Sequence, residues 1–62
     1  MKFKEYDVVK VLKDHEDVRR EEIGTVIMTF ENPNEAYEVE FLDKEGNPKA
    51  QYTFLPNDLE KA

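Results

Sequence analysis

The chain has 62 residues, no cysteine and a formal net charge of −6, from 15 acidic and 9 basic residues. A chain of this length buries only roughly 60% of the surface that its unfolded form exposes, and without cysteine it has neither disulfides nor thiolate metal ligands. No apolar run is long enough for a membrane helix or a signal peptide, so we expect a single cytoplasmic domain over residues 1–62, with no membrane contact.

The first half of the chain predicts two strands separated by a charged loop. Residues 6–12 are rich in β-branched side chains and contain neither Gly nor Pro, which favours a strand. Nine of the ten residues in 13–22 are charged or His, which predicts a solvated loop with at most one helical turn. Residues 23–30 are β-prone, and Gly24 near their start indicates a bulge or a close approach of neighbouring backbone.

The third strand shows the clearest periodicity. Asn32-Pro33-Asn34 supplies turn residues that end the second strand and reverse the chain. Apolar and acidic residues then alternate strictly over residues 37–41, as in a strand with one buried and one hydrated face. We therefore expect Tyr37, Val39 and Phe41 to point into the core.

A second hairpin and a terminal turn complete the predicted elements. Gly46 lies within the predicted loop 43–47, at a position suited to positive φ. The strand that follows, over residues 49–55, has alternate side chains on its buried face, namely Ala50, Tyr52 and Phe54. Pro56, Asn57 and Asp58 favour a single 3-10 turn, after which Leu59 should close the end of the fold.

Four or five short antiparallel strands without a long helix bury one face most simply by curling up. The predicted fold is therefore all-β, a small SH3-like barrel with a short 3-10 turn near the C-terminus. Five aromatic residues fall in strand phase with other apolar side chains, and we expect most of them in the core: Phe30, Tyr37, Phe41, Tyr52 and Phe54.

The order of these elements resembles a small bacterial SH3-like family, the domain-of-unknown-function family 4926, over nearly the whole chain. Four segments carry the resemblance: YDVV at 6–9, GTV at 24–26, YEVEF at 37–41 and LPNDL at 55–59. It implies a barrel and no assigned activity. The GTV step is also similar to the turn of KOW-type barrels, which implies RNA, but Glu21 and Glu22 stand where a Gly-containing turn and basic flanks are expected.

The sequence offers little for catalysis or metal binding. It has no Ser and no Cys, and its only imidazole, His15, lies in the charged loop without a residue to orient it. The acidic run around His15 lacks the spacing and the glycine of an EF-hand loop. We therefore expect a protein that is not an enzyme and has no metal and no cofactor.

Negative charge is concentrated in the middle of the chain. Residues 31–46 carry six acidic residues and one Lys, a net −5, whereas residues 1–13 carry four Lys and two acidic residues, a net +2. Glu38 and Glu40 should lie about 7 Å apart on one strand face, where solubility explains them better than a catalytic pair held in a cleft.

We predict a protein-interaction module that binds another protein with a basic surface through this acidic face and the charged loop, as an antitoxin or immunity protein does. Nucleic acid is disfavoured by the overall charge. The oligomeric state stays open, since strand edges or apolar side chains such as Ile27 and Leu55 could pair with a second copy. The predicted contact residues are Glu31, Glu35, Glu38, Glu40, Asp43 and Glu45.

The rival hypothesis is an RNA- or ribosome-associated, KOW-like barrel. It needs aromatic rings on which bases can stack, next to basic side chains that contact phosphates. The only aromatics in a basic setting lie near the N-terminus, and the charged loop would have to fold back to join them. The residues of this patch are Lys2, Phe3, Lys4, Tyr6, Lys10, Arg19 and Arg20.

Overall fold

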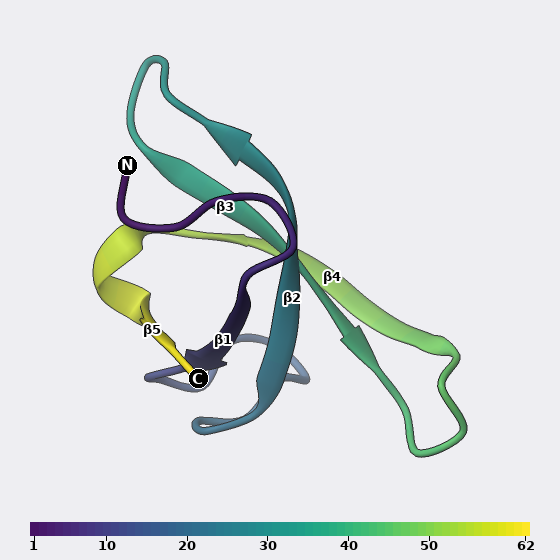
Figure 1. Ribbon diagram of the computed structural model, residues 1–62. Coiled ribbons are helices and arrows are strands. Elements are labelled where there is room, and N and C mark those ends of the chain that lie inside the picture. The colour runs from purple at the N-terminus through teal and green to yellow at the C-terminus, as the bar shows by residue number, and fades with distance from the viewer.

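Five antiparallel strands form one twisted sheet in the computed structural model, which describes residues 1–62 (Figure 1). The elements are β1 (Val8–Val11), β2 (Ile23–Phe30), β3 (Ala36–Leu42), β4 (Pro48–Phe54), the 3-10 turn η1 (Pro56–Asp58) and β5 (Leu59–Lys61). This arrangement confirms the all-β class, the antiparallel strands and the 3-10 turn. Leu59, expected only to close the end of the fold, begins the short fifth strand.

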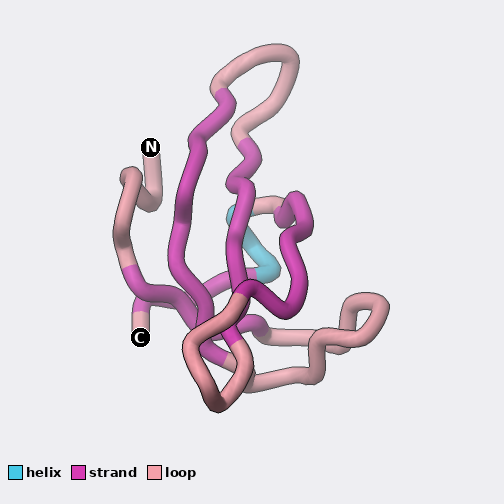
Figure 2. The backbone as a smooth tube through the Cα atoms, turned by 90° about the vertical axis from the view of Figure 1, so that its right-hand side faces the viewer, coloured by secondary structure: helices cyan, strands magenta, loops and turns pink.

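The sheet order is β4-β3-β2-β1-β5, so β4 and β5 are its two edges. No strand pairing joins these edges and the ladder is not closed, although η1 connects them directly in sequence. The β2–β3 and β3–β4 connections project from opposite ends of the sheet (Figure 1). A side view shows the loops extending beyond the strands at both ends (Figure 2).

The inner face of the sheet carries the core. Tyr37, Val39 and Phe41 are at most 1% exposed, which confirms the alternation predicted for β3. On β4, Phe54 is also buried, and Ala50 and Tyr52 pack against the same cluster. The predicted inner faces of these two strands are therefore correct.

A β-bulge in β2 corrects the expected position of Phe30. The register between β2 and β3 shifts between Val26 and Met28, which inserts one extra residue into β2. Gly24 and Val26 face the core, but beyond the bulge the phase is reversed and Phe30 points outward with 36% of its surface exposed. Sequence alternation alone does not reveal this change of phase.

Two buried side chains come from outside the sheet. Phe3 precedes β1, and Val18 lies in the charged loop 13–22, yet both belong to the core cluster. The loop is pinned by two backbone hydrogen bonds between His15 and Val18, of 2.8 and 2.9 Å. The His15 ring lies 4.9 Å from the ring centroids of both Tyr52 and Phe54. The loop is thus solvated over most of its residues, as the sequence predicted, but it is anchored on the core by Val18 and His15.

Gly24 lies in β2 in close contact with residues of β3. A Cβ atom at this position would be 2.6 Å from Val39 Cγ1 and 2.9 Å from the carbonyl oxygen of Glu40. The predicted close approach is therefore confirmed. Gly46 is confirmed at positive φ, +87°, but a Cβ there would meet no atom within 4 Å.

We predict that Gly24→Ala lowers the free energy of unfolding by about 1 to 3 kcal/mol, because backbone must move to admit the methyl group. Gly46→Asn is the matched control, since Asn tolerates positive φ and the site has free space. Urea unfolding of both variants checks the prediction. Equal stability of Gly24→Ala and wild type would show that β2 and β3 separate easily at this point.

Candidate functional site

The face of the sheet opposite the core, called here the outer sheet face, is centred on Glu38 and Glu40 of β3. In the strand register Glu40 lies between Thr25 and Gln51, and Glu38 lies between Met28 and Thr53. Side chains opposite each other in a ladder share one face. The outer sheet face therefore consists of Val8, Lys10, Ile23, Thr25, Met28, Phe30, Ala36, Glu38, Glu40, Leu42, Gln51, Thr53 and Glu60.

Glu38 is held in a fixed orientation by its β4 neighbours. Its Oε2 accepts a hydrogen bond of 2.9 Å from Gln51 Nε2, and its Oε1 accepts one of 2.5 Å from the Thr53 hydroxyl. Both donors are neutral, so neither supplies a counter-charge to the carboxylate. Its orientation is fixed without neutralisation.

Large apolar side chains surround the two carboxylates. Ile23, Met28 and Leu42 are each 50–54% exposed, and Val8 is 45% exposed. Exposed apolar side chains grouped on one face are typical of interaction surfaces. The sequence analysis missed this apolar part, although the phase of β3 already places Leu42 on the same side as Glu38 and Glu40.

The acidic residues fall into two groups by their ion pairs. All five salt bridges of the structure use other carboxylates, those of Asp7, Asp14, Glu22, Asp58 and Glu60. None of them uses any of the six acidic residues predicted for partner binding. The negative charge of residues 31–45 is thus not compensated by ion pairs within the chain.

The structure does not bring those six residues together. Glu31 and Glu35 lie in the β2–β3 connection, and Asp43 and Glu45 lie in the β3–β4 hairpin at the opposite end of the sheet (Figure 1). Asp43 Oδ1 accepts the backbone N–H groups of Glu45 and Asn47, each at 2.9 Å, and so shapes the hairpin. Glu38 and Glu40 alone lie on the outer sheet face.

Glu35 ties residues 1–7, called here the N-terminal strap, to β3. The Tyr37 hydroxyl donates a hydrogen bond to Glu35 Oε2 and accepts one of 3.1 Å from the Phe3 N–H. The Lys2 N–H also donates to Glu35 Oε2, at 3.0 Å. The bond from Tyr37 lowers the pKa of Glu35, and burial followed by this bond raises the pKa of Tyr37.

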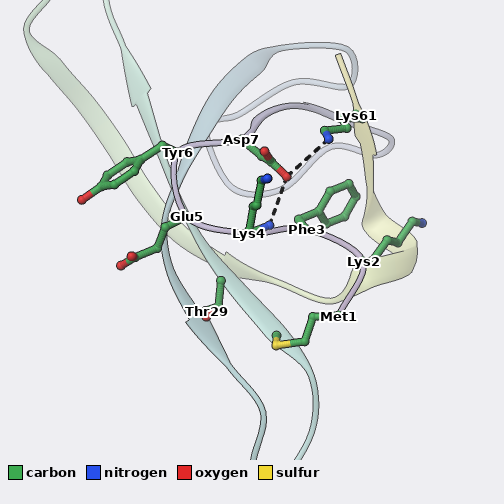
Figure 3. A pocket seen from close by; sticks show the side chains of 9 residues that line it. All are labelled: Met1, Lys2, Phe3, Lys4, Glu5, Tyr6, Asp7, Thr29 and Lys61. Carbon is green, nitrogen blue, oxygen red and sulfur yellow. Dashed lines mark hydrogen bonds and ion pairs between the residues drawn. The ribbon is translucent and has the colours of Figure 1, made fainter.

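The strap forms one wall of the larger concavity, of about 780 Å³. Four residues of the rival nucleic-acid patch line it: Lys2, Phe3, Lys4 and Tyr6 (Figure 3). Phe3 is only 4% exposed, so its ring is not available for base stacking. The Tyr6 ring, which is exposed, points away from the Phe3 ring (Figure 3).

The remaining basic residues of that patch lie outside this concavity. Lys10 pairs with Glu60 at 3.3 Å on the β1–β5 ladder, and Arg19 lies 3.8 Å from Asp14 within the loop. Arg20 lies in the same loop, where its backbone N–H donates to Asp14 Oδ1 at 2.8 Å. None of the three lines the concavity formed by the strap.

No group of three or more His, Cys, Asp or Glu side chains is placed to hold a metal ion. The structure contains no helix with the length and apolarity needed to cross a lipid bilayer.

The fold and this surface define a class: a small all-β domain in which an inner strand, β3, has core side chains on one face and carboxylates without ion pairs on the other. Residues 5–61 match the family described as a domain of unknown function (DUF4926), and the chain belongs to this family. The resemblance seen in the sequence is thereby confirmed. No curated protein and no solved structure matches the chain.

We predict that the N-terminal strap loosens in acid. Because the folded-state pKa of Glu35 is lowered, its contribution to stability is complete above the ordinary Glu pKa and is lost as pH falls through the lowered value. Amide hydrogen exchange at Phe3, followed by NMR as a function of pH, measures this. Glu35→Gln should show fast exchange of the Phe3 amide at neutral pH already.

Glu31→Gln is the matched control, because it removes an exposed carboxylate from the same connection without touching the strap. It should retain the protection of the Phe3 amide at neutral pH. Equal protection in Glu35→Gln and wild type would contradict a role of Glu35 in holding the strap.

Proposed function

We propose that this protein is a cytoplasmic protein-interaction module that binds a basic surface of another protein through its outer sheet face. One observation carries the proposal: Glu38 and Glu40 are free of ion pairs and lie among half-exposed apolar side chains. A partner that brings Lys or Arg and apolar groups would compensate the charge and remove the apolar surface from water in one step.

Charge complementarity of this kind acts on the association rate and on partner choice. Opposite surface potentials steer the encounter, and a partner with like charge is rejected. The net charge of −6 extends the attraction beyond the two carboxylates. Masking of a partner's basic site, as by an antitoxin or immunity protein, is the role within this class that the electrostatics favour.

The proposal assigns no catalysis to the chain. His15 packs between the rings of Tyr52 and Phe54, on the inner side of β4. Glu38 is oriented by two neutral donors on an open strand face, without the cleft that separates the pKa values of a catalytic carboxylate pair. Both arrangements support binding over chemistry.

We predict that the double charge reversal Glu38→Lys with Glu40→Lys abolishes capture of the natural partner from cell extract. The immobilised wild-type protein should retain a partner that elutes with added salt. The variant should not retain it, because its Lys side chains repel the partner's basic surface. Quantitative mass spectrometry of the captured proteins makes the comparison.

The matched control is Glu5→Lys with Glu16→Lys, which changes the net charge equally at exposed positions outside the outer sheet face. This control should keep the partner. Loss of the partner from both double variants would point to net charge alone, and retention by both would overturn the proposal. A gel-shift titration with RNA at low salt tests the rival, and we expect no shift.

A further inference from the structure

We propose that the partner contributes an extended segment that adds to the free edge of β4 as a sixth strand, with an apolar side chain seated in the depression beside it. This inference rests on the proposed function and names the form of the partner at the same surface. Strand addition supplies affinity through backbone hydrogen bonds, while pockets for alternate side chains supply specificity.

The backbone of β4 is unpaired on the side that faces away from β3. On the β1 side of β2, Val26 donates to the Asp7 carbonyl and accepts from the Tyr6 N–H. Because Val26 bonds toward β1, its ladder partner Val39 directs its backbone groups toward β4, where they face Tyr52. Backbone groups of successive residues alternate in direction, so those of Gln51 and Thr53 point away from β3. No backbone or side-chain group bonds to them from that side, and both residues are exposed.

The free edge of β4 is protected only at its hairpin end. Exposed edges are normally blunted by Pro, Lys, bulges or short length. The hairpin end of β4 has Pro48, Lys49 and a bulge opposite Phe41 and Leu42. The half that ends at Phe54 carries none of these features, so an added strand is blocked at one end of β4 and admitted at the other.

A depression of about 380 Å³ adjoins the unprotected half of the β4 edge. Thr53 lies on the free edge of β4 and also lines the depression. Leu55, which follows β4, lines the depression as well and is 55% exposed. The apolar part of its lining suits an aliphatic side chain. The full lining is Phe30, Asn32, Pro33, Asn34, Ala36, Thr53 and Leu55.

Charge decides which segment fits. Glu38 lies beside Gln51 and Thr53 on the outer sheet face, so side chains of the added strand on that face meet its carboxylate. Lys or Arg at alternate positions matches this arrangement. A second copy of the chain would place its own Glu38 and a net charge of −6 at the same edge, and like charges oppose such pairing.

The probe is a synthetic, capped peptide, Lys-Thr-Lys-Thr-Leu-Thr-Lys-Thr-Lys, which we expect to pair antiparallel to β4. Its Lys and Leu side chains share one face, and in an antiparallel pairing with that face on the outer side their N–H groups point toward β4. Isothermal titration calorimetry and NMR of the protein amides follow its binding. We expect saturable binding with shifts centred on Gln51, Thr53 and Leu55.

Two isomeric peptides separate strand addition from simple charge attraction. One is N-methylated at Leu and at the Lys two residues away on the same face, and the other is N-methylated at the two Thr residues flanking Leu. The first loses the N–H groups that face β4, and we expect its affinity to fall about ten-fold or more. The second keeps those groups and should bind within about two-fold of the parent peptide.

Protein variants test the same edge from the other side. Gln51→Pro removes one outward N–H, which an edge strand tolerates, whereas Gln51→Val changes the side chain and keeps the N–H. We expect Gln51→Pro alone to weaken the parent peptide about ten-fold. Leu55→Ser should weaken it as well, because the depression loses its aliphatic contact. An amide NMR spectrum that is unchanged away from the substituted residue confirms that each variant is folded.

The outcomes distinguish the two levels of the proposal. Peptide binding that needs Glu38 and Glu40 but tolerates both N-methylated isomers overturns strand addition and leaves the charged face intact. No binding of the peptide also overturns strand addition, while capture of the natural partner still decides the proposed function. A dimer seen by light scattering that Gln51→Pro dissociates would assign the edge to a second copy and overturn the basic segment as occupant.

Discussion

The edge-to-face contact between Phe3 and Tyr37 is the interaction on which the rest of the structure depends. The ring centroids lie 5.1 Å apart at an interplanar angle of 78°, a geometry favoured by the quadrupoles of aromatic rings. Tyr37 lies in β3 and pairs with Thr29 of β2 and Phe54 of β4. One contact therefore joins the N-terminal strap to β3 and, through its neighbours in the ladder, to β2 and β4. The buried hydroxyl of Tyr37 is satisfied because the strap itself donates the Phe3 N–H.

The need for that strap follows from the size of the core. Ten buried residues form the cluster, and the chain has no disulfide to reinforce it. Each apolar side chain removed from water contributes about 1.5 to 3 kcal/mol to the stability of the fold. Phe3 and Val18, which come from outside the sheet, therefore supply a substantial share of the stabilisation by the core. Their segments cover the inner face of the sheet, and the outer sheet face is left to water or to a partner.

Sequence predicted what depends on local alternation and turn chemistry. The inner residues of β3, the close approach at Gly24 and the positive φ of Gly46 all follow from short stretches of chain. The burial of Phe3 and Val18 does not, because each is an isolated apolar residue among charged neighbours, and only the packing of distant segments buries it. The reversed phase at Phe30 depends on a bulge, which alternation of the flanking residues does not reveal.

The candidate site shows the same division. Strand alternation placed Glu38 and Glu40 on the outer sheet face, but it treated the acidic residues 31–45 as one surface. The rise of about 3.3 Å per residue along β3 instead separates Glu31 and Glu35 from Asp43 and Glu45 by the length of the strand (Figure 1). Two of the four then serve the fold itself, Glu35 in the strap and Asp43 in the hairpin.

The two edge strands of the open sheet, β4 and β5, differ in length and in how far their outer backbone groups are protected. A barrel with a closed ladder would have no such edges. β5 has three residues, and the Lys2 ammonium donates to the carbonyl of Leu59, so this edge is short and partly occupied by the strap. β4 has seven residues and is protected only at its hairpin end. Closure of the ladder would pair these edges with each other and satisfy both. The turn η1 connects β4 to β5, but the two strands do not pair with each other. The outer backbone groups of β4 therefore stay unpaired, and they lie on the strand next to Glu38, whose charge has no ion pair within the chain.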